Sequence, residues 1–250
     1  MPDLIAGVLH TQGLGWIALA AFLGGLVRGF AGFGTALVFL PVAAQFLTPF
    51  QSILALTFMD LIGPVPNLRR AWPQVEKGDL ARLLIGTAVM LPVGLGVLSV
   101  VDAGVFRYAV SALALGMLLV LLGGLRYRGA VTRRMVIGIG GAAGFLGGVA
   151  GLPGPAVILF YMARPLAASV IRATTLFYLF CFDGLIIFGM GLFGRWESGA
   201  VVLGLCLAVP CMAGNWLGGA LFRPSLEKAY RGLAYGLIAL SALSGLPLWG

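Results

Sequence analysis

Residues 24–34 read GGLVRGFAGFG, and residues 140–155 read GGAAGFLGGVAGLPGP. Each stretch interrupts an otherwise apolar segment, and the two begin 116 positions apart. Glycine and proline leave backbone groups that hydrocarbon cannot satisfy, so such a break is tolerated only where it faces protein or a water-filled cavity. Broken segments at matching places in two halves of a chain indicate where a transporter binds its substrate.

The composition is typical of an integral membrane protein. Of the 250 residues, 60% are hydrophobic and 10% are charged, whereas soluble domains carry about 25% charged residues. The net charge of +8 comes mostly from Lys and Arg in short loops, where positive charge sets membrane topology. It does not indicate a nucleic-acid partner. We predict an all-α polytopic membrane protein with a single transmembrane domain over residues 1–250.

Apolar segments recur along the whole chain and group into two halves. We predict repeat 1 over about 12–125 and repeat 2 over about 134–248, with about five segments in each. Matching pairs of residues include Gly29 with Gly148, Gly32 with Gly151, and Pro92 with Pro210. The expected segments are 12–28, 34–48, 50–68, 80–100, 104–125, 134–148, 153–163, 166–193, 198–222 and 226–248.

The loop charges favour an inverted arrangement of the two repeats. If each broken pair of segments makes an even number of crossings, 13 basic residues share one side of the membrane, and only Arg107 and Arg195 face the other. If each pair is one broken span, the best split is 9 against 6. The positive-inside rule prefers the first arrangement. Both termini are then non-cytoplasmic, and each broken pair is either a re-entrant hairpin or two short spans.

Arg28 is the most informative single residue, because it lies in an apolar stretch directly before the first break. A charge at membrane depth costs at least about 2.5–3.5 kcal/mol, so it usually faces a cavity or a partner. One interpretation is an anion-binding arginine that holds a sulfonate or carboxylate through two hydrogen bonds. The alternatives are a side chain that reaches the interface and a structural pair with Asp60.

The helix after each break should begin with free backbone N–H groups, which attract anions. Glycine lets the backbone approach the ligand closely, and proline suits a first helical turn. Hydroxyls near the start of the eighth segment could bond a substrate oxygen or bond back to helix carbonyls. Close helix packing is the alternative for the glycines. The predicted binding residues besides Arg28 are Gly29, Gly32, Phe33, Gly34, Thr35, Gly151, Pro153, Gly154, Arg172, Thr174 and Thr175.

Asp60 and Asp183 lie within the third and eighth apolar segments. An intramembrane carboxylate can carry a proton for coupling, so both are candidates for coupling to H⁺ or Na⁺. The alternative is a structural role beside Arg28 or Arg172.

No enzyme signature is visible in the chain. The single histidine, His10, allows neither a histidine-based triad nor a site with several histidine ligands, and there is no phosphate-binding loop. We therefore expect no enzyme activity, no metal and no bound cofactor. The expected partners are a small anionic substrate and the lipid bilayer, and pairing of two copies as a homodimer is left open.

The chain resembles the TauE/SafE family of sulfite exporters, also called toluenesulfonate uptake permeases. The similarity extends from about 14 to 248 and rests on residues 28–34 with Pro41 downstream, on residues 91–94, on residues 151–155 and on residues 172–175. The resemblance implies a multi-pass protein of the bacterial inner membrane that transports small sulfur-containing or organic anions.

Many members of this family carry three glycines where this chain has Phe33-Gly34-Thr35, and they lack an arginine at the position of Arg28. A larger organic anion, bound partly by Arg28, is therefore as consistent with the resemblance as sulfite. We predict a secondary transporter of sulfite or organosulfonates that works by alternating access, with its site between the two breaks near the membrane midplane. The alternatives are an anion channel and a transporter of small carboxylates.

Overall fold

The computed structural model describes residues 7–31, 33–63, 65–123, 127, 129–221 and 227–246. Residues 30, 31, 66, 67, 162, 168, 227 and 228 are described by their backbone alone. Throughout these described residues the regular structure is helical, which confirms the predicted all-α class. Gly32, one of the predicted binding residues, lies outside the described residues.

The helices follow the predicted apolar segments, with two differences. The segment expected at 34–48 contains α3, which ends at Ala43. The segment expected at 50–68 forms two helices, α4 and α5. The sequence between them is Gly63-Pro64, where glycine adds backbone freedom and proline lacks an amide donor, and both weaken a helix. The α-helices are α2 Leu14–Ala31, α3 Thr35–Ala43, α4 Pro49–Ile62, α5 Val65–Ala71, α6 Lys77–Leu98, α7 Ala103–Leu122, α8 Arg133–Ala150, α9 Gly154–Phe160, α10 Ala168–Leu192, α11 Ser198–Leu221 and α12 Glu227–Gly245. The 3₁₀ turns η1 Trp72–Gln74 and η2 Tyr161–Ala163 follow α5 and α9.

Four of the described helices, α6, α7, α10 and α11, are long and apolar enough to cross a membrane. The outward face of α6 is an example of this apolar character. Ile85, Val89, Val93 and Val97 recur every four residues, and all four are exposed. Such a row of large apolar side chains on one helix face suits contact with lipid. The chain is therefore a polytopic membrane protein.

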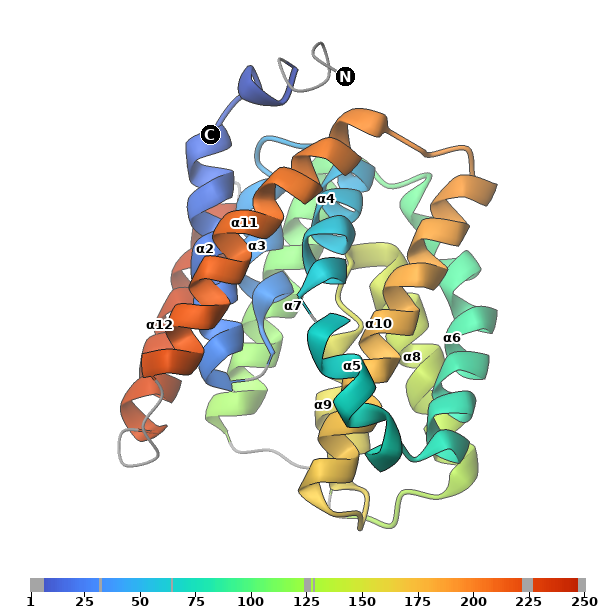
Figure 1. Ribbon diagram of the computed structural model, residues 1–250. Coiled ribbons are helices and arrows are strands. Elements are labelled where there is room, and N and C mark those ends of the chain that lie inside the picture. Colours follow the sequence, from blue (N-terminus) through green and yellow to red (C-terminus); the bar gives the residue numbers. More distant parts are fainter. Residues whose placement is uncertain are drawn as a thin grey trace. The chain divides into compact units, whose positions relative to one another are not determined.

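The helices form two compact units, and each unit takes helices from both predicted repeats. Unit 1 comprises residues 1–60, 101–122 and 197–250, and unit 2 comprises residues 61–100 and 123–196. Unit 1 thus holds α2, α3, α4, α7, α11 and α12, while unit 2 holds α5, α6, α8, α9 and α10 (Figure 1).

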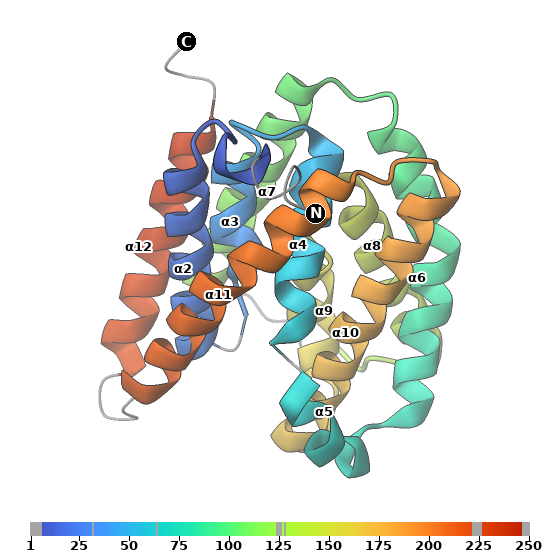
Figure 2. The same ribbon diagram turned by 45° about the horizontal axis from the view of Figure 1, so that its top comes forward.

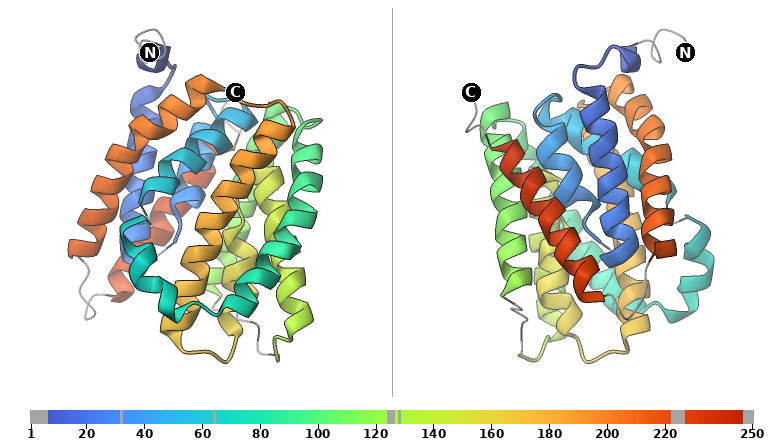
Figure 3. Two further views of the ribbon diagram at one scale, coloured as in Figure 1. Left: turned by 45° about the vertical axis from the view of Figure 1, so that its right-hand side comes forward. Right: turned by 90° about the vertical axis from the view of Figure 1, so that its left-hand side faces the viewer.

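In unit 1, α2 and α11 cross in backbone contact through small residues. A methyl group on Gly25 would overlap the carbonyl of Cys211, and one on Gly29 would lie 2.5 Å from the carbonyl oxygen of Asn215. From the other side, a methyl group on Gly218 would lie 2.5 Å from the carbonyl oxygen of Leu26. Small residues let membrane helices approach in this way. Helix α12 packs against α2, α3 and α7, as Figure 3 shows.

In unit 2, α6 and α8 repeat this packing, and the two helices lie side by side in Figures 1 and 2. Methyl groups on Gly86 and Gly140 would overlap the carbonyls of Ile137 and Leu83. A methyl group on Gly148 would lie 2.9 Å from the Cα of Gly94. The contact of Gly148 with Gly94 corresponds to that of Gly29 with Gly218 in unit 1. In each unit, the fourth segment of one predicted repeat therefore packs on the first segment of the other repeat.

Candidate functional site

The first break folds the chain back on itself within unit 1. Helix α2 ends at Ala31, and α3 begins at Thr35 and returns beside α2 (Figure 3). Gly34 has φ of +111°, and a methyl group on it would lie 2.8 Å from Cγ1 of Val27. Only glycine combines this backbone conformation with this close approach. Helix α3 has 9 residues and rises about 14 Å, which is half of the roughly 30 Å hydrocarbon core.

Arg28, in the last turn of α2, forms an ion pair with Asp60 in the last turn of α4. The distance from Arg28 Nη1 to Asp60 Oδ1 is 2.9 Å. The two side chains are 19% and 20% exposed, and the paired Oδ1 atom of Asp60 is itself buried. The structure thus shows the pairing that the sequence left open, and it brings one predicted binding residue together with one predicted coupling residue.

The other described residues of the first break lie on α2, on α3 and in the connection between these helices. Thr35 is 3% exposed, and within the described residues its hydroxyl has no hydrogen-bond partner. A methyl group on Gly24 would meet the Thr35 carbonyl at 3.0 Å, which places Thr35 one turn before Arg28 along α2. Gly29 lies in the contact with α11 and serves packing there. Phe33 is half-buried in the connection.

The second break is a helix end in unit 2. Helix α8 ends at Ala150, and Gly151 adopts the left-handed conformation with φ of +68°. The amide groups of Gly151 and Leu152 donate to the carbonyls of Gly147 and Leu146, at 2.9 and 3.4 Å. This is the usual glycine-terminated helix end. Pro153 is buried and precedes α9, which Gly154 begins.

We expect Gly151→Ala to lower the stability of the folded protein by about 1–2 kcal/mol, because an alanine is strained in the left-handed region. The matched control is Gly138→Ala on the same helix, where a methyl group meets nothing within 4 Å. Thermal unfolding midpoints in detergent measure both variants. Equal midpoints for the two would show that the left-handed residue is not needed at the break.

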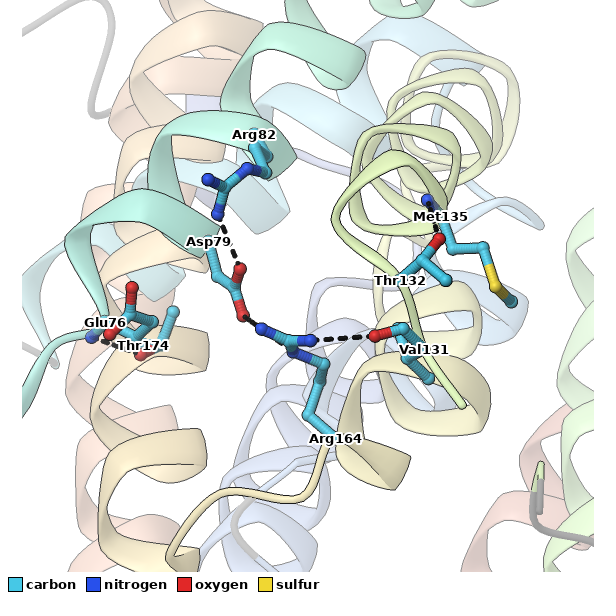
Figure 4. A network of polar contacts seen from close by, with 8 residues as sticks. All are labelled: Glu76, Asp79, Arg82, Val131, Thr132, Met135, Arg164 and Thr174. Carbon is cyan, nitrogen blue, oxygen red and sulfur yellow. Dashed lines mark hydrogen bonds and ion pairs between the residues drawn. The ribbon is translucent and has the colours of Figure 1, made fainter. Parts of the chain in front are cut away.

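A buried ionic network joins three loop segments at one end of unit 2 (Figure 4). Asp79, in the first turn of α6, is fully buried and accepts from Arg82 Nη1 at 3.0 Å and from Arg164 Nε at 2.9 Å. Arg164 also donates to the carbonyl of Val131 at 2.7 Å. The network thus connects the start of α6, the residues just before α8 and the loop after η2.

The predicted residues of α10 take different positions around this network. Thr174 is fully buried, and its hydroxyl accepts a hydrogen bond from the Glu76 amide at 3.0 Å, which caps the start of α6. The Thr175 hydroxyl is buried without a hydrogen-bond partner in the described part of the chain. Arg172 is exposed, and Asp183 is half-buried further along the helix. Their roles in binding or coupling stay predictions.

Sequence reasoning missed the network of Asp79, Arg82 and Arg164. Asp79 carries no prediction above, and the two arginines enter only among the 13 basic residues of the loops. A signal was present, because Asp79 and Arg82 are spaced i, i+3 at a helix start, where an acidic residue is favoured. Nothing local in the sequence linked either residue to Arg164, which is 85 positions away.

These observations define a polytopic membrane protein of the transporter type, with glycine-broken helices in two units and a charged pair at the first break. The family model described as sulfite exporter TauE/SafE matches residues 17–245, and the chain belongs to this family. The family consists of transporters, so the chain is a membrane transport protein. No match was found among curated proteins or among solved structures.

Proposed function

We propose that this protein is a secondary transporter of small sulfur-containing anions, sulfite or organosulfonates, and that Arg28 holds the anion. The observation that carries the proposal is the position of Arg28: it is a charged residue in an apolar helix, at a glycine break, and its side chain is 19% exposed. A guanidinium presents a fork of donors that matches two oxygens of a sulfonate. The pairing with Asp60 holds the charge in place when no anion is bound.

The hydroxyl of Thr35 supports the same site. It is buried at the N-terminus of α3, and it has no hydrogen-bond partner within the described residues. Buried polar groups normally have partners, and a hydroxyl near an anion donates to it. The N-terminus of α3, where Thr35 lies, also carries partial positive charge that attracts anions. Thr35 and Arg28 both belong to unit 1, so this half of the site is built within one unit.

The orientation of the chain is part of the proposal. The positive-inside rule places the end of unit 2 that holds the ionic network, with its basic residues Arg69, Arg70, Lys77, Arg133 and Arg134, on the cytoplasmic side. With inverted repeats, both termini are then non-cytoplasmic, in the inner membrane of a bacterium. The short α3 favours a re-entrant hairpin over a second full span.

Uptake into liposomes tests the proposal with sulfite, sulfoacetate, 4-toluenesulfonate and acetate as candidate substrates. We expect wild-type protein to transport at least one sulfur anion, and Arg28→Gln to weaken its binding roughly 10- to 100-fold, since hydrogen bonds to charged groups contribute about 1.5–3 kcal/mol. Arg195→Gln, at an exposed position after α10, is the matched control. The double variant Arg28→Gln/Asp60→Asn, which leaves no unpaired charge, checks that folding survives.

Normal transport by Arg28→Gln would contradict the assigned role of Arg28. Transport of acetate without any sulfur anion would make this chain a carboxylate carrier. A channel is separated from a carrier by accumulation: a channel cannot move an anion against its electrochemical gradient. The paired breaks and the half-buried Arg28 favour a carrier with alternating access, because a pore needs no binding charge balanced by a carboxylate.

A further inference from the structure

Asp60 and Arg28 are isolated charges in an apolar part of unit 1. Helices α3 and α11 contain no charged residue, and the only charged residues of α2 and α4 are Arg28 and Asp60 themselves. Cys211 of α11 is buried, and its carbonyl lies against Gly25 of α2. Helix α12 packs on α2 and carries Tyr230, Arg231 and Tyr235, besides Glu227 and Lys228, whose side chains lie outside the described residues.

In unit 2 an aromatic ring, not a charged side chain, fills the contact that corresponds to Arg28. Gly147 precedes Gly148 as Arg28 precedes Gly29, and the ring of Phe182 fills the space against Gly147. Beside it, the Thr87 hydroxyl donates to the Gly140 carbonyl at 3.0 Å and shares a 2.9 Å hydrogen bond with the Tyr178 hydroxyl.

Buried ion pairs are seldom more stabilising than apolar groups of similar size. Since the Phe182 ring fills the corresponding contact in unit 2, packing alone does not explain why unit 1 places Arg28 beside Asp60. A charged pair at a glycine break, one fifth exposed on each side chain, is suited to a change of partner. An anion that binds Arg28 must compete with the carboxylate that already neutralises it.

We infer that Asp60 is the proton carrier of the transporter, and that a proton and an anion bind together by exchange at Arg28. In the empty state Asp60 is ionised and pairs with Arg28. A proton taken from the aqueous phase converts the Asp60 carboxylate to the neutral acid, and the guanidinium then pairs with the incoming anion. On release, the anion leaves, the Asp60 proton returns to the aqueous phase on that side, and the ion pair forms again.

This scheme fixes the stoichiometry and the charge that moves. One proton travels with one anion, so a monovalent sulfonate crosses without net charge, and the membrane potential does not drive it. After release of the anion, the empty site returns to the other side of the membrane with Arg28 and Asp60 paired, and therefore without net charge. The inference rests on the proposed function, because it assumes that Arg28 binds the anion, and it adds which residue couples transport to protons.

The test is calorimetric binding of 4-toluenesulfonate to the full chain in detergent, between about pH 5.5 and 8.5. The probe keeps its single negative charge across this range, so any pH dependence belongs to the protein. Titration in buffers of different ionisation enthalpy counts the protons taken up with each anion. At pH values where Asp60 is ionised in the empty protein, wild-type protein should take up about one proton with each anion. Its affinity for the probe should then fall about tenfold for each unit of rising pH.

Asp60→Asn should bind the probe with no proton uptake and with an affinity that does not change with pH. Asp102→Asn, an exposed carboxylate before α7, is the matched control and should behave as wild type. If Asp60→Asn keeps the proton uptake, or if Asp183→Asn loses it instead, Asp60 is not the proton carrier, although the anion site stands. If wild-type protein binds neither this probe nor sulfite at any pH, the proposed function fails, and this inference fails with it.

Discussion

Gly86→Leu is expected to prevent α6 from packing on α8, so that little folded protein is recovered. A methyl group on Gly86 would already overlap the carbonyl of Ile137 and lie 2.6 Å from the Gly141 amide nitrogen. Both obstacles are backbone atoms of α8, which cannot rotate out of the way as a side chain can. Overpacked cores lose about 1–3 kcal/mol when side chains can adjust, so we expect a larger loss here.

Gly96→Leu is the matched control, because it lies on the same helix and a methyl group there meets nothing within 4 Å. Size-exclusion profiles of detergent extracts measure the folded fraction of each variant. A normal profile for Gly86→Leu would mean that the close contact of α6 with α8 is not needed for folding. The equivalent experiment in unit 1 compares Gly214→Leu, which overlaps the Phe22 carbonyl, with Gly219→Leu, which meets nothing.

The glycine contacts also show where sequence comparison of the two halves fails. The sequence matched Pro92 with Pro210, but the packing makes Gly94 equivalent to Gly218, since these two meet Gly148 and Gly29. Proline positions are visible in a sequence, whereas helix contacts depend on which residue faces a distant partner. The helix ends were predictable because loop charges and prolines mark them locally. The packing of α6 on α8 and of α11 on α2 was not predictable, because each contact joins helices of different repeats.

The candidate site was also predictable only in part. Arg28 stood out because a charge in an apolar segment is costly, and the break beside it was visible as a run of glycines. Its pairing with Asp60 is a contact between residues 32 positions apart, on helices separated by α3. The sequence therefore offered that pair only as one alternative. The spacing of Asp79 and Arg82 indicated a local pair, but the burial of Asp79 was not predictable, because an aspartate at a helix start is usually exposed.

Arg164→Met is expected to destabilise the protein by about 3 kcal/mol or more, because it leaves the buried carboxylate of Asp79 without its principal partner. Asp79 is fully buried, and Arg164 connects it to the carbonyl of Val131 before α8. Arg82→Met should cost less, about 1 kcal/mol, because Arg82 is 27% exposed and its i, i+3 pair resembles a surface contact. Unfolding of the purified variants in a graded series of denaturing detergent measures this order.

The double variant Asp79→Asn/Arg164→Met shows whether the loss comes from the unpaired charge. If it does, the double variant should be more stable than the sum of the single effects predicts, because no buried carboxylate is left without a cation. Asp102→Asn, at an exposed carboxylate, should change stability by less than about 0.5 kcal/mol. Equal effects of Arg164→Met and Arg82→Met would contradict the assigned importance of Arg164.

The same experiment on the other ion pair should give the opposite result. Arg28→Met/Asp60→Leu removes both charges from an apolar contact that unit 2 builds with Gly147, Phe182 and a neutral hydrogen bond, so stability should be unchanged or higher. Transport should be lost, because no cation remains for the anion. A pair that can be replaced without loss of stability, but not without loss of transport, is held for function. A strong loss of stability in this double variant would instead make the Arg28–Asp60 pair structural, like that of Asp79 and Arg164.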